Sequence, residues 1–380
     1  SRLLTVNGVK VGFVGVTTDV KGAEYIERFL PPIEIVGNAT RRLRQQGAQL
    51  VVAITHQTVA QDKALLAALG DNAPDFIAGG HEHDRQHHVV NGRHLVKADA
   101  DVASAAVVRI TVQQARPLTQ VATQVEYVEF PGQYQPDRAL TRRLVEWNRR
   151  FDCEYCTEHK LLADCMDDVL GKTRVDLVAE ELTIRRYETN LGNLLADTAR
   201  ATHAAQGAQI AFLNSGSMRL NYNIPPGNIT RRYIDTLFAY PTRLALIRVT
   251  GKQLQDVVNH AITDWTGNGR WLQISGFAFK HNPVSGTAEG LSLITPQGLR
   301  PVRPDETLLA VTNEYLLDRN GDQDGYRMLG DEMVVNPAQP RADLKDKLIE
   351  ALARERTAGI APAVEGRICN VQREAVCKLF

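Results

Sequence analysis

Short apolar runs alternate with helical stretches over the first third of the chain, and this alternation strongly constrains the fold. The runs KVGFVGVTT, LVVAIT and DFIAGG, which begin at Lys10, Leu50 and Asp75, have the length and apolar character of buried strands. Helical stretches separate them, the first with Pro31 and Pro32 where a helix can begin. The later runs HLVKAD and AAVVRITV look like further strands and close the segment near residue 125. This β-α-β-α-β order predicts a layered α/β sheet.

The composition excludes several classes of partner. Lysine plus arginine and aspartate plus glutamate both number 44, so the formal charge is zero and gives no electrostatic footprint for nucleic acid. No apolar run approaches the roughly 20 residues of a spanning helix, so we expect no membrane span. The opening SRLLTVNG has no initiator Met and no signal pattern, which is typical of a mature or trimmed product.

Five cysteines leave the redox compartment open. They form one cluster in the middle of the chain and a pair near its end: Cys153, Cys156, Cys165, Cys369 and Cys377. Two disulfides with a spare thiol and five reduced thiols both fit this count. The middle cluster resembles a zinc knuckle only loosely, and we favour a disulfide or helix-packing thiols over zinc.

Four histidines lie in the segment IAGGHEHDRQHH, directly after an apolar run. His81 and His83 follow the strand that ends near Gly79, and His56 follows the strand before it. Because the carboxyl ends of strands in an open α/β sheet meet at one crevice, we expect these three imidazoles to lie together as metal ligands. His87, His88 and His94 have no such placement, and we expect them to be ordinary surface histidines.

The acidic ligands of a metal site are scarce in this segment. Three imidazoles could complete a single zinc site with one open position. A hydrolytic centre with two hard metal ions would add carboxylates, and Asp19 is the one weak candidate at the end of an earlier strand.

Several ordered motifs resemble a known family. VVAITHQ followed by DFIAGGHEH is similar to the later half of the calcineurin-like metallophosphatase domain of the 5′-nucleotidase family. The segments YETNLGNLLADTAR, AFLNSGSMR, LIRVTGKQLQDVVNHAI, RWLQISGFAF and GDQDGY resemble successive landmarks of that family's carboxyl-terminal domain. The resemblance implies three parts: the second half of a four-layer metallophosphatase sandwich over 1–125, a linking helix region over 126–167, and a substrate-binding α/β domain over 168–380.

The resemblance also implies two divalent metal ions. His56 and His81 would bind one ion and His83 the other. The family's D-x-H and G-N-H motifs, which supply the bridging Asp, the Asn ligand and the catalytic His–Asp pair, would precede residue 1. We therefore expect the chain alone to bind metal poorly and to be inactive, with its own amino-terminal segment as a partner. Export to the periplasm or the extracellular space is a further implication.

Five residues of the carboxyl-terminal part are candidates for holding a phosphorylated substrate. Asn214 and Arg219 flank a Gly loop at a strand end, where an amide and a guanidinium can recognise phosphate or carboxylate. By resemblance, the same two residues hold substrate in the family, and Arg185 matches another arginine of the site. Tyr315 would stack on a base, and Asp324 would bind sugar hydroxyls.

Two departures from the family pattern bear on the substrate. Gln323 replaces the usual Gly before Asp324, and Leu244 replaces a second stacking aromatic. The function implied is metal-dependent hydrolysis of a nucleotide phosphoester. A phosphatase for a non-nucleotide substrate and a non-catalytic nucleotide or sugar-phosphate binding module remain alternatives. An amidohydrolase is disfavoured because no eightfold β-α repeat is present.

Overall fold

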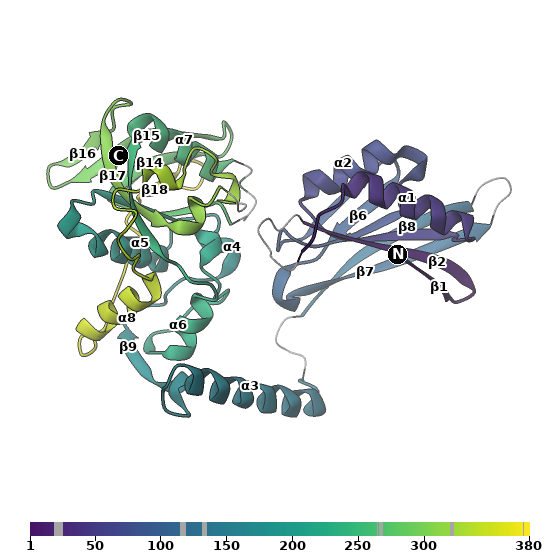
Figure 1. Ribbon diagram of the computed structural model, residues 1–380, viewed down its shortest axis with the longest axis horizontal. Coiled ribbons are helices and arrows are strands. Elements are labelled where there is room, and N and C mark those ends of the chain that lie inside the picture. The colour runs from purple at the N-terminus through teal and green to yellow at the C-terminus, as the bar shows by residue number, and fades with distance from the viewer. Residues whose placement is uncertain are drawn as a thin grey trace. The chain divides into compact units, whose positions relative to one another are not determined.

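The chain folds into two compact units, Ser1–Pro136 and Asp137–Phe380 (Figure 1). The computed structural model describes residues 1–18, 26–114, 119–130, 135–263, 265, 269–319, 323–374 and 376–380. Asp19 lies outside these residues.

The first unit is built on a mixed sheet. Its strands are β1 (Arg2–Val6), β2 (Val9–Thr17), β3 (Leu50–His56), β4 (Phe76–Gly79), β5 (Gln86–Val90) and β6 (Arg93–Lys97), followed by β7 (Ser104–Gln114) and β8 (Thr119–Glu129). The sheet order is β1-β2-β3-β4-β6-β5, in which β2, β3, β4 and β6 run parallel and the two outer strands antiparallel. The predicted α/β class is confirmed.

Alternate side chains of the central strands supply two separate cores. Ala53 and Ile77 point to one face, where α1 (Pro32–Gln45) and α2 (Val59–Leu69) cover them (Figure 1). Val52 and Phe76 point to the opposite face, where the β7–β8 hairpin packs. Both faces of the parallel strands are therefore buried, which explains their continuous apolar runs.

The second unit contains the remaining helices and strands. Its described helices are α3 (Arg138–Glu158), α4 (Glu181–Ile184), α5 (Asn190–Thr202), α6 (Arg231–Leu237), α7 (Gly251–Ile262) and α8 (Leu344–Arg354). Its described strands are β9 (Val169–Thr173), β10 (Ile210–Asn214), β11 (Gly227–Thr230), β12 (Leu244–Thr250), β13 (Leu272–Ser275), β14 (Phe277–Asn282), β15 (Thr287–Thr295), β16 (Gly298–Pro301), β17 (Thr307–Asn313) and β18 (Ile368–Asn370).

A sheet in the order β12-β17-β10-β13 divides the second unit into two cores. Phe212 and Ile247 face the core that includes α7 residues, whereas Leu213 and Leu246 face the core that includes α5 and α8 residues. The strands β10 and β17 run parallel, so their carboxyl ends lie side by side. Asn214 closes the first of these strands and Asn313 the second.

Local signals explain where the helices begin. Thr58 forms a capping box with Gln61 at the start of α2, and Thr189 accepts a hydrogen bond from the Gly192 amide at the start of α5. Each cap satisfies amides that the first helical turn leaves without partners. Of Thr189 and Asn190, which the sequence offers as caps for α5, Thr189 takes this role.

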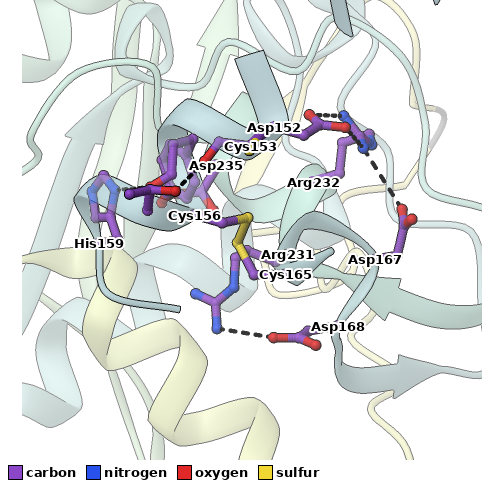
Figure 2. The surroundings of a disulfide bond; sticks show 12 residues. Asp152, Cys153, Cys156, His159, Cys165, Asp167, Asp168, Arg231, Arg232 and Asp235 are labelled. Atoms are coloured by element: carbon purple, nitrogen blue, oxygen red, sulfur yellow. Dashed lines mark hydrogen bonds and ion pairs between the residues drawn. A yellow bond between two sulfur atoms is a disulfide. The ribbon is translucent and has the colours of Figure 1, made fainter. Parts of the chain in front are cut away.

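A disulfide ties the end of α3 to the chain that follows it (Figure 2). Cys156 and Cys165 are bonded, whereas Cys153, one turn earlier, is exposed and free. Beside the disulfide, Arg232 of α6 pairs with Asp152 at 2.7 Å. A second disulfide joins Cys369 to Cys377. Of the two cysteine arrangements that the count allowed, the structure contains two disulfides and one thiol.

Among the described residues, none of the helices combines the length and the apolar character needed to cross a membrane. In the first unit, the sequence patterns missed β1, β5 and β8. In β5, QHHVV carries polar side chains on an edge strand, so its pattern differs from that of a buried run.

Candidate functional site

The predicted metal ligands follow two neighbouring strands of the first unit. His56 is the last residue of β3, and His81 comes two residues after the end of β4. Residue Thr55 of β3 pairs with Gly79 of β4, so the two strands end at the same edge of the sheet. The imidazole rings of His56 and His81 lie edge to face with centroids 5.3 Å apart.

Two glycines allow this close approach. A Cβ on Gly80 would lie 3.2 Å from Nδ1 of His56, and a Cβ on Gly79 would lie 2.8 Å from Cε of Lys97. A larger residue at either position would push these side chains away. The glycine pair of the sequence motif thus has a packing role.

The spacing of the two rings fits one metal ion. Imidazole nitrogens bind zinc at roughly 2.0–2.1 Å, which for tetrahedral geometry places two ring centroids roughly 5 Å apart. His81 is exposed and His83 half-buried, and both have left-handed backbone, with φ of 92° and 65°. No group of three or more His, Cys, Asp or Glu side chains within the described ranges is arranged to hold an ion. The pair His56–His81 therefore has the spacing that two ligands of one ion need.

In the second unit, hydrogen bonds join three of the five predicted substrate residues. The Asn214 amide donates to Oδ2 of Asp324 at 2.7 Å, and the Tyr315 hydroxyl donates to Oδ1 of Asp324 at 3.2 Å. Asn313, at the end of the parallel strand, donates to Oδ1 of Asn214 at 2.6 Å. We call Asn214, Asn313, Tyr315 and Asp324 the amide–carboxylate group.

The loop that carries Asp324 is held from several sides. Nε2 of His260 lies 2.8 Å from the Asp324 carbonyl, so a protonated Nε2 donates to it. Tyr326 is fully buried and donates to the Arg270 carbonyl at 2.5 Å. Burial, reinforced by the Asp324 carboxylate, raises the pKa of Tyr326, so this phenol stays a donor.

Gln323 explains how the loop tolerates its departure from the family pattern. Its side chain is fully buried, donates to the Leu316 carbonyl at 2.9 Å and accepts from Arg327 at 3.0 Å. Gln323 and Asp324 both have left-handed backbone, with φ of 57° and 47°. The buried hydrogen bonds of Gln323 stabilise a turn that glycine would adopt without strain.

The two predicted arginines are placed by other partners. Arg185 is buried at the end of α4 and pairs with Glu181 at 2.8 Å. The Arg219 guanidinium lies 5.6 Å from the centre of the Tyr240 ring. Nε of Arg219 is buried without a hydrogen-bond partner among the described residues, and this is an unmet donor that an anion could satisfy.

Leu244 is fully buried at the start of β12 and packs in the core with Leu213. Tyr315, in contrast, is 39% exposed, which leaves part of its ring available to a ligand. One accessible aromatic therefore stands beside Asp324, at a position that the sequence identified.

Sequence reasoning missed the roles of three residues that shape these sites, although it noted Gln323 as a departure from the family pattern. Asn313 was missed because its role depends on strand pairing, and Gln323 because a buried glutamine in a left-handed turn has no sequence signal. Glu82, between the two histidines, was given no role, whereas the fold pairs it with Lys97.

Comparisons with known proteins agree with this architecture. Residues 169–331 match the family model described as 5′-nucleotidase, C-terminal domain. A protein named 5NUC from Lutzomyia longipalpis is 23% identical over 97% of this chain and 68% of its own length. A protein named Endonuclease YhcR from Bacillus subtilis is 23% identical over 90% of this chain, which spans only 27% of that relative.

A solved structure shares the fold. The 5′-nucleotidase precursor from Thermus thermophilus superimposes with a TM-score of 0.75, at 22% identity, over 97% of this chain and 74% of that one. The match covers both units and shows a shared fold. The family model, which covers residues 169–331, agrees with the resemblance that the motifs indicated for the carboxyl-terminal part.

Proposed function

We propose that this chain, whose residues 169–331 match the model of the 5′-nucleotidase carboxyl-terminal domain, serves the metal-dependent hydrolysis of a phosphoester, with a nucleotide as the substrate. The amide–carboxylate group is the observation that supports this proposal most strongly. It brings Asn214, Tyr315 and Asp324, which are far apart in the sequence, into one hydrogen-bonded cluster inside the matched domain.

Each candidate substrate residue of the second unit is proposed to have a role that suits its side chain. The exposed ring of Tyr315 stacks on the nucleobase, and the Asp324 carboxylate accepts hydrogen bonds from sugar hydroxyls. Asn214 orients Asp324 through its amide. Arg219, whose Nε is an unmet donor, and Arg185 contribute positive charge for the phosphate.

The histidines of the first unit are proposed to bind two divalent metal ions, His56 and His81 one ion and His83 the other. When bound, such ions polarise a phosphoester and assist the attack of water. Imidazoles alone do not compensate the charge of two divalent ions, so we expect hydrolysis to need carboxylate ligands beyond these three residues. Relatives of this family include a cell wall protein from Listeria monocytogenes, and a location outside the cytoplasm is part of the proposal.

Phosphate release tests the proposal. In a form of the protein that also supplies the D-x-H and G-N-H motifs, we expect release from a nucleoside 5′-monophosphate to require a divalent metal and to be lost in His81→Ala. The 380-residue chain by itself is the control and should release little. Metal-independent turnover would contradict the mechanism, and ordinary turnover by the chain alone would contradict the ligand assignment.

The burial of Leu244 favours a second candidate, a phosphatase for a non-nucleotide substrate. A base held by one aromatic face loses roughly 1–3 kcal/mol relative to a base held by two. If ribose 5-phosphate is hydrolysed as efficiently as a nucleotide, the base is not recognised and this candidate replaces the first. If neither is hydrolysed while the nucleotide still binds, the unit is a non-catalytic binding module.

A further inference from the structure

A buried lysine lies next to the histidine loop of the first unit. Lys97 ends β6, and its side chain is only 1% exposed. Its Nζ lies 3.0 Å from Oδ2 of Asp62 and 2.5 Å from Oε2 of Glu82, and it donates to the Gln57 carbonyl at 2.7 Å. Burying an unpaired ammonium costs several kcal/mol. The Lys97 side chain should therefore stay in the one position where it contacts these three acceptors.

Glu82 belongs to the histidine loop itself, because it stands between His81 and His83. One oxygen, Oε2, pairs with Lys97, and the other, Oε1, accepts from the backbone amide of Val59, the first residue of α2. The amino terminus of a helix favours a negative charge at this place. Both carboxylate oxygens of Glu82 are therefore hydrogen-bonded within the first unit, one to Lys97 at the end of β6 and one to the first residue of α2.

The loop that Glu82 holds is strained. His81 and His83 both have left-handed backbone, with φ of 92° and 65°. Such conformations cost about 1–3 kcal/mol each for residues with a side chain, and they persist only where neighbouring contacts hold them. The His83 carbonyl accepts from the Ala100 amide at 3.1 Å, which fixes the far side of the loop. Glu82 fixes its centre.

We infer that Glu82, anchored by Lys97 and by the start of α2, is a positioning residue for the metal ligands. It holds the strained turn that carries His81 and His83, so that the His81 ring keeps its edge-to-face arrangement with His56, and it does not bind the ion. The inference rests on the proposed metal role of these histidines. Oδ2 of Asp62 lies 3.0 Å from Nζ of Lys97, so Asp62 is a second acceptor that keeps Lys97 in place.

A purely structural ion pair would also stabilise the first unit, so the test must separate positioning from stability. The measurement is calorimetric titration with Co²⁺ of the form of the protein that also supplies the D-x-H and G-N-H motifs, together with the Co²⁺ absorption spectrum and the melting temperature. Glu82→Gln keeps the shape and the acceptor for Val59 but removes the charge. Loss of a residue that orients a ligand typically weakens metal binding about 10–100-fold, and we expect at least about tenfold with an altered spectrum.

Two control variants make the outcome decisive. Glu126→Gln removes an exposed carboxylate of β8, which is 61% exposed, and should leave both readouts unchanged. Leu65→Ala opens a cavity under α2, lowers the melting temperature and should leave the spectrum unchanged. Equal effects of Leu65→Ala and Glu82→Gln on Co²⁺ binding would overturn the positioning role.

A further outcome separates this inference from the proposed function. If His81→Ala binds Co²⁺ as tightly as the wild type, His81 is not a metal ligand. Both the proposed metal site and the positioning role of Glu82 are then contradicted. If His81→Ala loses binding but Glu82→Gln and Lys97→Met do not weaken it, the metal site stands and the positioning role is overturned. The double variant of Glu82 and Lys97 should be no weaker than the worse single one, because the two residues act as a unit.

Discussion

The Asn214 side chain donates to the Asp324 carboxylate at 2.7 Å across 110 residues of sequence. This hydrogen bond joins the end of β10 to a left-handed turn that also holds the hydroxyl of Tyr315. Because the Asp324 carboxylate is charged, removing this hydrogen bond should cost more stability than removing a hydrogen bond between two neutral groups. The substrate side of the protein is therefore assembled by tertiary contacts, and its residues should respond to mutation as a group.

Substitution Asp324→Asn should weaken the binding of a nucleoside monophosphate about 10–100-fold, since hydrogen bonds to a charged group contribute about 1.5–3 kcal/mol. Titration calorimetry measures this change. Asp256→Asn on the exposed face of α7 is the matched control and should bind like the wild type. Equal binding by both variants would remove Asp324 from the site.

Tyr315 contributes through its ring rather than its hydroxyl. Tyr315→Leu should weaken nucleotide binding by about 1–3 kcal/mol, the range for loss of one base–aromatic contact, with little effect on ribose 5-phosphate. Tyr315→Phe keeps the ring and should bind within a few-fold of the wild type. A loss in Tyr315→Phe as large as in Tyr315→Leu would show that the hydrogen bond to Asp324 dominates instead.

Reduction should destabilise one unit and spare the other. All five cysteines lie after Pro136, and the Cys156–Cys165 bond anchors the end of α3. Loss of a native disulfide typically costs about 2–5 kcal/mol. Calorimetry with and without a reductant should show a lower melting temperature for the second unit and an unchanged one for the first. A shift of both transitions would contradict this.

The second unit should lose stability in mild acid because of His281. Its ring is fully buried between Trp265 and Trp271, and burial lowers the pKa of His281 to about 4. The pKa of His281 is lower in the folded protein than in the unfolded one, so burial of the neutral ring contributes fully to the free energy of unfolding above about pH 6.5. This contribution, roughly 3 kcal/mol, is lost as the pH falls toward 4. His281→Phe should flatten this dependence in urea unfolding. An identical pH dependence in both proteins would refute the assignment.

The parts of the fold that could be predicted are those with a local cause. The run at Leu50–His56 is apolar because both faces of β3 are covered. Thr189 can be identified as a cap from the sequence because its side chain accepts a hydrogen bond from its own helix. The strand β5 was missed because an edge strand with QHHVV lacks the apolar run of a buried strand. The rings of His87 and His94 in this hairpin stack on each other, with Nε2 of His87 3.0 Å from Nδ1 of His94.

The candidate site was predictable only in part for the same reason. His56 and His81 follow strand ends, and that position is visible in the sequence. Asn313 gains its role from the parallel register of two strands, and Glu82 from a lysine at the end of a third strand. Such partners are set by tertiary packing, so no spacing rule along the chain reveals them.

The most direct test of the account is a calorimetric titration of the 380-residue chain with a nucleoside 5′-monophosphate in the presence of a chelator. The account predicts metal-free binding that Asp324→Asn and Arg219→Ala both weaken at least about tenfold, with the parent nucleoside binding less tightly than the monophosphate. Binding that neither substitution changes, or no binding at millimolar ligand, would contradict the claim that the second unit holds a nucleotide.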